Sequence, residues 1–206
     1  FWDDVMAHIE KHEEELLRVC MIPDVDQGTR DRHFKLIIIR RCMKGQFDVP
    51  ANDYESVQKQ AKATIPSNAK RFSGKTLPGP YKFFGLGGLM VPTDPNFPAV
   101  DILWYLGTTR LIGVQVHLVI DQENAVNAFE DLCRGARLDD HFDSIEMWYL
   151  SPTTAAADKV RGFCGKHDCG TTRRLSKNWS IDVKARTIND ISCLQDLPWS
   201  HPSNLS

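Results

Sequence analysis

The sequence predicts an α/β fold, in which a mixed sheet of about four or five strands has helices on both faces and follows an N-terminal helical section. Two observations carry this prediction. Apolar residues recur at helical spacing near the start of the chain, whereas residues 99–185 contain short apolar runs separated by amphipathic helical stretches. Strands that alternate with helices are typical of a mixed sheet covered by helices. The 206 residues, 42% of them hydrophobic, are sufficient for one well-buried domain.

The first part of the chain is predicted to be helical. Residues 1–21 show the apolar spacing of an amphipathic helix. Residues 29–43 are compatible with a helix capped by Thr29 or with a short buried strand, and their length favours the helix. Residues 53–63 predict a further short helix with Asp53 as its N-cap.

The rest of the chain is predicted to form the sheet and its covering helices. Six prolines over residues 64–98 exclude a long helix there, and residues 81–91 predict one or two strands. We place a boundary near residue 76, with a helical, locally basic section over 1–76 and the α/β domain over 77–206. The further predicted strands are 99–106, 111–120, 145–150 and 179–185, with a turn at 108–110 and helices at 123–137 and 153–163.

Charge is unevenly distributed, although the formal net charge is only −2. Residues 1–20 contain six acidic and two basic side chains, whereas residues 28–82 contain twelve Lys and Arg against four acids. Such a stretch is typical either of a phosphate-facing surface or of an ordinary solvated face. If the domain binds nucleic acid, the expected phosphate contacts are Lys70, Arg71, Lys75, Arg173 and Arg174.

The six cysteines are irregularly spaced and do not form the framework of a small disulfide-rich domain. Cys20, Cys42, Cys133 and Cys193 lie in apolar or helical contexts, which indicates reduced, mostly buried thiols. We therefore expect a reducing compartment, the cytosol or the nucleus. The sequence shows neither the apolar run of a membrane span nor a signal-peptide pattern, so no membrane partner is expected.

The polar residues most suggestive of chemistry lie on two neighbouring predicted strands. Asp101 is on the first, and Gln115 and His117 are on the second, about one hairpin later. Because side chains alternate between the faces of a strand, Gln115 and His117 share a face and can both approach Asp101. Metal-dependent nucleases need a carboxylate and a neighbouring acceptor to hold a divalent cation. The alternative is that Asp101 is an ordinary strand-end acid and the other two are satisfied polar residues.

These strands resemble part of a known family. The segments Val100-Asp101-Ile102-Leu103 and Gly113-Val114-Gln115-Val116-His117-Leu118, followed by a helix and a strand ending near a proline, are similar to the C-terminal nuclease-like domain of crinkler and retrotransposon-hot-spot (RHS) proteins. The resemblance covers roughly residues 80–186. It implies a restriction-endonuclease-like fold related to the PD-(D/E)xK nucleases, in which an Asp and a Glu bind Mg²⁺ and a Lys assists the chemistry.

Carried over residue by residue, the resemblance assigns the metal-binding Asp to Asp101, the Glu to Gln115 and the Lys to His117. Gln115 offers an amide oxygen but no charge, which weakens Mg²⁺ binding. His117 can transfer protons near neutral pH, but it is not a fixed cation. The candidates for the missing negative charge are Asp121, Glu123, Glu13, Glu14 and Glu15.

Two other segments contain candidate sites. Residues 69–76 resemble a relaxed phosphate-binding loop, but the expected flanking strand is absent and Leu77-Pro78-Gly79-Pro80 excludes the helix that such a loop requires. Cys164, His167 and Cys169 offer three zinc ligands within one loop, where a structural site needs four, so free thiols are the alternative.

Three hypotheses remain open. The first is a Mg²⁺-dependent DNA nuclease with Asp101 and Gln115 as metal ligands and His117 as the proton-transfer residue. The second is a catalytically decayed domain that binds nucleic acid or protein, and the third is an unrelated α/β domain, favoured if Asp101 and Gln115 lie far apart or point into the core. The resemblance also implies a nuclear location, DNA rather than RNA as substrate, and an ATPase domain elsewhere in a longer chain.

Overall fold

The computed structural model describes residues 2–51, 62–66, 69–73, 87–94, 97–107, 109–118, 125–153, 172–176 and 179–200. In chain order its elements are α1 (Trp2–Met21), α2 (Gln27–Lys44), β1 (Phe47–Pro50), β2 (Lys62–Ile65), β3 (Ala69–Phe72), β4 (Gly88–Pro92), β5 (Ile102–Leu106), β6 (Arg110–Val116), α3 (Ala125–Gly135), η2 (Leu138–Asp140), β7 (Ser144–Ser151), β8 (Thr172–Ser176), β9 (Trp179–Thr187), η3 (Ile188–Asp190), η4 (Ser192–Leu194) and η5 (Pro198–Ser200).

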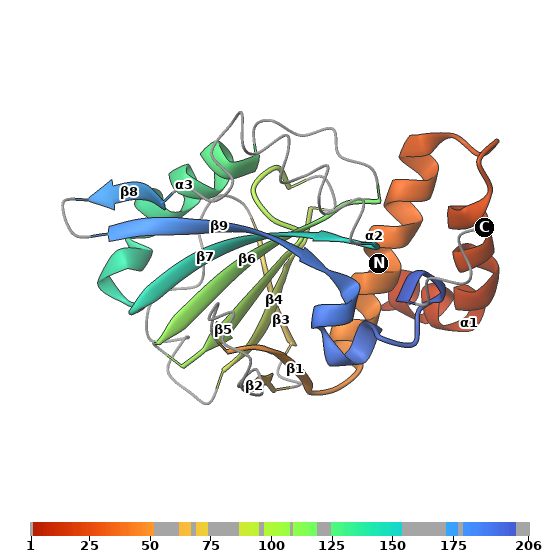
Figure 1. The fold of residues 1–206 in the computed structure, drawn as a ribbon, viewed down its shortest axis with the longest axis horizontal. Coiled ribbons are helices and arrows are strands. Elements are labelled where there is room, and N and C mark those ends of the chain that lie inside the picture. Colours follow the sequence, from red (N-terminus) through yellow and green to blue (C-terminus); the bar gives the residue numbers. More distant parts are fainter. Residues whose placement is uncertain are drawn as a thin grey trace.

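The described strands form one mixed seven-stranded sheet and one two-stranded sheet (Figure 1). The large sheet has the order β3-β4-β5-β6-β7-β9-β8, and β1 pairs with β2 in the small one. Strand β5 runs antiparallel to both β4 and β6, whereas β7 runs parallel to both β6 and β9. Helix α3 lies in the connection between the parallel strands β6 and β7. The predicted mixed sheet with flanking helices and N-terminal helices is therefore confirmed, with more strands than expected.

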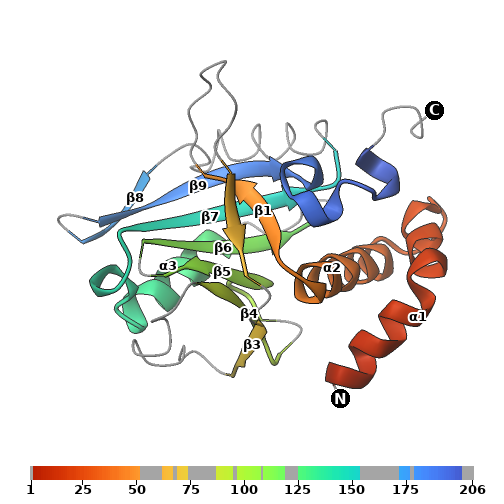
Figure 2. The same cartoon turned by 90° about the horizontal axis from the view of Figure 1, so that it is seen from below.

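Alternation along β6 divides the core between the two faces of the sheet. Ile112, Val114 and Val116 belong to the hydrophobic cluster that includes α1, α2, β1 and the C-terminal 3₁₀ turns, whereas Leu111 belongs to the cluster built with α3. Figure 2 shows α2 between the sheet and α1, which lies outermost. The α3 side is packed so closely that a Cβ atom at Gly113 would lie 2.6 Å from the ring of Phe129.

Helix α2 settles the ambiguity between helix and strand over residues 29–43. Its first turn is capped by Asp26, whose carboxylate accepts a hydrogen bond from the Thr29 amide at 2.8 Å. The fully buried residues Phe34, Ile37, Ile38 and Cys42 recur at helical spacing and face the core. A helix buries this pattern along one side, whereas a strand would divide it between two faces.

The structure departs from the sequence prediction at several boundaries. Residues 62 and 63, predicted as the end of a helix, lie in strand β2, and the rest of that predicted helix lies outside the described residues. Strand β5 begins at Ile102 rather than at residue 99, and Arg110, predicted in a turn, is the first residue of β6. Strands β1, β3 and β8 were not predicted. The predicted helix over 153–163 lies outside the described residues except for Thr153, which is in a bend.

The N-terminal section and the α/β section share one core. Strand β3, which precedes the predicted boundary at residue 76, pairs with β4 at the edge of the large sheet. Helices α1 and α2 bury Met6, Ile9 and Phe34 in the same cluster as Trp104 and Trp148 of the sheet. Residues 1–76 therefore supply one layer and one edge strand of the fold.

Candidate functional site

Asp101 lies just before β5 and is almost completely buried, with 4% of its surface exposed. Its amide donates to the Val114 carbonyl at 2.8 Å, which holds the residue against β6. Its Oδ2 accepts a hydrogen bond from the Val116 amide, also at 2.8 Å. The carboxylate is therefore fixed at the start of β5 and the end of β6, where the sequence placed it.

The counter-ion of Asp101 is Lys35, a residue that the sequence analysis did not select. Lys35 extends from α2, and its Nζ lies 2.8 Å from Asp101 Oδ1. Burial raises the pKa of Asp101, while the Lys35 ammonium and the Val116 amide act in the opposite direction. Both oxygens of this buried carboxylate therefore have a protein partner, Oδ1 in an ion pair and Oδ2 in a hydrogen bond.

Gln115 and His117 lie at the end of β6, with exposed fractions of 1% and 3%. The Gln115 Nε2 donates to the Pro98 carbonyl at 3.3 Å, but its Oε1 has no hydrogen-bond partner. His117 stacks on Tyr149 with ring centroids 5.8 Å apart, and its Nε2 also lacks a partner. These two buried polar atoms are exceptions in an interior where such atoms are normally paired.

His117 is neutral at physiological pH. Burial lowers its pKa to about 4, and the positive charge of Lys35 acts in the same direction, whereas Asp101 opposes both. The structure thus brings Lys35, Asp101 and His117 into one electrostatic group. A neutral imidazole can accept a proton, but it does not supply the positive charge of the Lys in PD-(D/E)xK nucleases.

The donor set around Asp101 does not fit Mg²⁺. This cation prefers several oxygen ligands and negative charge. Here one carboxylate is already paired with an ammonium, one neighbour is an amide and the other an imidazole. Within the described ranges no group of three or more His, Cys, Asp or Glu side chains is arranged to hold a metal ion.

The acids proposed to supply extra charge are engaged elsewhere or lie outside the described residues. Glu13 accepts hydrogen bonds from Arg41, at 2.8 Å from Nε and 2.5 Å from Nη2. The Oε2 atom of Glu15 lies 3.4 Å from Nδ1 of His12. Glu14 lines a polar cavity between α1 and α2. Asp121 and Glu123 are among the residues that are not described.

The described basic candidates for nucleic-acid contact come from the two opposite edge strands of the large sheet. Lys70 and Arg71 lie on β3 and Arg173 and Arg174 on β8, and these strands are the two opposite edges of the large sheet. Arg71 also forms an ion pair with Asp3 at 2.7 Å. Lys75 lies outside the described residues.

Part of the basic charge in residues 28–82 is neutralised by the acidic first helix. Arg40 pairs with Glu10 at 2.5 Å, and Arg41 binds both Glu13 and Asp196. Since α1 supplies two of these carboxylates, the charge asymmetry in the sequence is explained in part by the packing of α1 on α2.

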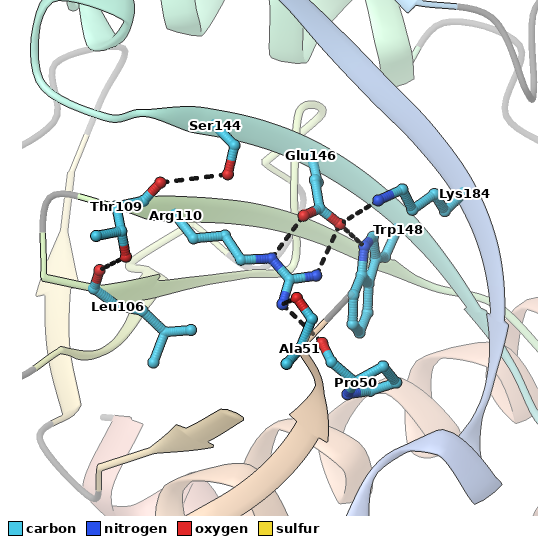
Figure 3. A network of polar contacts seen from close by, with 9 residues as sticks. All are labelled: Pro50, Ala51, Leu106, Thr109, Arg110, Ser144, Glu146, Trp148 and Lys184. Atoms are coloured by element: carbon cyan, nitrogen blue, oxygen red, sulfur yellow. Dashed lines mark hydrogen bonds and ion pairs between the residues drawn. The ribbon is translucent and has the colours of Figure 1, made fainter. Parts of the chain in front are cut away.

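A second polar centre, which the sequence analysis missed, lies in the middle of the sheet (Figure 3). Glu146 on β7 is 5% exposed. Its carboxylate accepts hydrogen bonds from Arg110 at 2.5 and 2.9 Å, from Trp148 Nε1 at 2.7 Å and from Lys184 at 2.8 Å. The Arg110 guanidinium also donates to the Pro50 carbonyl at 2.6 Å, which ties β1 to the sheet.

This network lowers the pKa of Glu146 to about 2. Burial acts in the opposite direction, but the hydrogen bonds and charges of Arg110 and Lys184 outweigh it. The signal in the sequence was Glu146, an acid at the second position of the otherwise apolar run 145–150, which requires a partner when the run is buried.

The remaining sequence candidates are only partly described. Residues 69–72 of the phosphate-loop-like segment form strand β3 rather than a loop, and residues 74–76 are not described. Cys164, His167 and Cys169 lie outside the described residues, so the zinc hypothesis stays a prediction. The described cysteines are not joined in disulfides: Cys20, Cys42 and Cys133 are buried and Cys193 is half-buried.

Comparisons of the chain with family models, curated proteins and solved structures found no match. No helix among the described residues is long and apolar enough to cross a membrane. The crinkler and RHS resemblance, the nuclear location and the nucleic-acid partner therefore stay predictions.

Proposed function

We propose that this chain is a nuclease-like domain that does not hydrolyse phosphodiesters and acts instead as a nucleic-acid-binding module. The ion pair between Lys35 and Asp101 carries the proposal. The Lys35 ammonium contacts Asp101, the one carboxylate among the expected catalytic residues Asp101, Gln115 and His117, at the oxygen that a metal ion would need. A divalent cation would have to displace Lys35 and then rely on a single negative charge, which is insufficient for firm Mg²⁺ binding.

The order of elements supports the nuclease-like part of the proposal. Three antiparallel strands, β4, β5 and β6, are followed by α3 and by β7, which is parallel to β6 and ends next to Pro152. Asp101 precedes β5, and Gln115 and His117 lie at the end of β6. This agrees with the pair of strands, helix and proline-ended strand in the crinkler and RHS resemblance. The burial of Asp101 and Gln115, with 4% and 1% of their surfaces exposed, favours the alternative of an unrelated α/β domain instead, and fold alone does not assign function.

The two edge strands are the proposed contacts to nucleic acid. Neighbouring strands lie about 4.8 Å apart, so the six intervals from β3 to β8 span about 29 Å. A straight duplex rises about 3.4 Å per base pair, so it reaches both edges only when it is about nine base pairs or longer. Shorter duplexes are expected to bind one edge at a time.

A plasmid-nicking assay with Mg²⁺ or Mn²⁺ tests the loss of catalysis. We expect no nicking by the unaltered chain, and the Asp101→Ala and His117→Ala variants supply the background. Circular dichroism must show that all three proteins are folded. Nicking by the unaltered chain that disappears in both variants would contradict the proposal.

Such a result would establish the second candidate function, phosphodiester hydrolysis. One observation favours it: Gln115 Oε1 and His117 Nε2, at the end of the strand that pairs with the Asp101 segment, are buried polar atoms without hydrogen-bond partners. Unpaired buried polar atoms are costly, and they are common where a ligand binds.

Fluorescence anisotropy with labelled duplexes of about 6 and about 20 base pairs tests nucleic-acid binding. Two charge-reversal variants, Lys70→Glu/Arg71→Glu and Arg173→Glu/Arg174→Glu, are each expected to weaken binding of the longer duplex about tenfold or more at low salt and to lower its salt dependence. Arg134→Glu on α3 is the control, which should leave affinity unchanged. Failure of the unaltered chain to bind either duplex at low salt would favour a protein partner.

A further inference from the structure

We propose that Cys42 and Cys193 form an oxidation site, at which a peroxide converts the two thiols into a disulfide that fastens the C-terminal segment to α2. The Sγ atoms lie 4.0 Å apart, although the two residues are 151 positions apart in the sequence. A disulfide requires about 2 Å between the sulfurs, so the two atoms must approach by about 2 Å. Cys193 lies in the one-turn helix η4 and is half-buried, which leaves its side chain room to turn.

The two thiols differ in access. Cys193 lines a polar cavity of about 770 Å³ between α1, α2 and the C-terminal segment, together with Arg41 and Lys44. Cys42, next to Cys193, is fully buried, and burial raises the pKa of its thiol well above the ordinary value. A small oxidant therefore reaches Cys193 first, while Cys42 stays protonated beside it.

The chemistry balances in two steps. The Cys193 sulfur attacks one oxygen of hydrogen peroxide, the O–O bond breaks, and a sulfenic acid and water are formed. The Cys42 sulfur then attacks the Cys193 sulfur, the S–O bond breaks, and the departing hydroxide takes the Cys42 proton to leave as a second water. Two thiols are oxidised to a disulfide and one peroxide is reduced to two waters.

The other described cysteines, Cys20 and Cys133, are buried. The Cys20 thiol donates to the Arg30 carbonyl at 3.4 Å, and burial raises its pKa to about 11. Cys133 is buried in the cluster on the α3 face of the sheet. Oxidation is therefore expected to be selective for Cys193 among the thiols that the structure describes.

The new bond would reinforce contacts that already join the two ends of the fold. The Asp48 amide donates to Ser192 Oγ at 2.8 Å, and Arg41 binds Asp196. Because the disulfide would close a long loop, it restricts the unfolded chain strongly. We expect the Tm of the oxidised protein to rise by roughly 5–15 °C, reversibly with a thiol reductant.

The full chain is treated with a small excess of hydrogen peroxide, digested without reduction, and mapped by mass spectrometry beside thermal unfolding. The expected result is a linked peptide pair containing Cys42 and Cys193 and a rise in Tm, both absent in Cys193→Ser. A Cys164→Ser/Cys169→Ser variant, which keeps the proposed pair, should behave like the unaltered chain. The proposal is overturned if Cys193 ends as a sulfinic acid or unmodified, or if the Tm rise persists in Cys193→Ser.

Discussion

Replacement of Glu146 by Gln tests how much the buried ionic network contributes to the stability of the fold. Gln has nearly the same shape, so the change removes the negative charge that Arg110 and Lys184 share while it preserves packing. The lowering of the Glu146 pKa from 4.5 to about 2 corresponds to about 3 kcal/mol of stability at neutral pH. Removal of one partner of a buried ion pair costs a similar 3–5 kcal/mol, roughly. We therefore expect Glu146→Gln to lower the free energy of unfolding by about 3 kcal/mol at pH 7.

The pH dependence separates this charge effect from a loss of packing. Because the folded-state pKa lies below the unfolded-state value, the stabilisation is fully present above about pH 4.5 and is lost as the pH falls towards 2. The difference between the two proteins should thus shrink on acidification.

Urea unfolding, monitored by tryptophan fluorescence at several pH values, measures this difference. Glu130→Gln is the matched control, because Glu130 pairs at 2.5 Å with Arg134, which is 53% exposed, and should cost less than about 1 kcal/mol. A Glu146→Gln effect that is no larger than the control, or that is the same at pH 7 and at about pH 2.5, would refute the reasoning.

Two further substitutions test a buried ion pair and a close packing contact of the sheet. Lys35→Met leaves the Asp101 carboxylate buried without its counter-ion. It should lower the free energy of unfolding, measured in urea at pH 7, by about 3 kcal/mol. Adding Asp101→Asn should recover most of this loss, and no recovery would show that the ion pair is not the cause. Gly113→Ala places a Cβ 2.6 Å from the Phe129 ring and should lower the free energy of unfolding, measured by thermal denaturation, by about 1–3 kcal/mol. Gly135→Ala, with nothing within 4 Å of its Cβ, should be neutral or stabilising, so equal losses at both glycines would contradict the steric argument.

Long periodic segments were predictable because the pattern and the packing agree. Helix α2 buries Phe34, Ile37 and Ile38 at helical spacing, and β6 alternates along seven residues. Strands β1, β2 and β3 each have four residues, too few for an alternation to emerge from local composition. These short strands form because they pair with strands elsewhere in the chain, and local sequence patterns do not predict such pairing.

The candidate site was predictable only in part, because some of its contacts join residues that are far apart in the sequence. Asp101, Gln115 and His117 could be placed together because a hairpin joins their strands. Lys35 reaches Asp101 through the packing of α2 on the sheet, and its position in a basic helix looked like that of a surface lysine. Tertiary packing, rather than local pattern, therefore decides the charge balance of the site.

The packing of the C-terminal turns has a consequence for how the chain folds during synthesis. Trp199 meets the ring of Phe34 edge-on, with centroids 5.1 Å apart, and Leu194 and Leu197 fill the same cluster beside α2. A growing polypeptide that has completed α1 and α2 therefore keeps part of their apolar surface in water until residues 194–199 have left the ribosome. Contacts of such long sequence separation also slow folding, so the nascent chain is expected to need protection from aggregation until these turns are made.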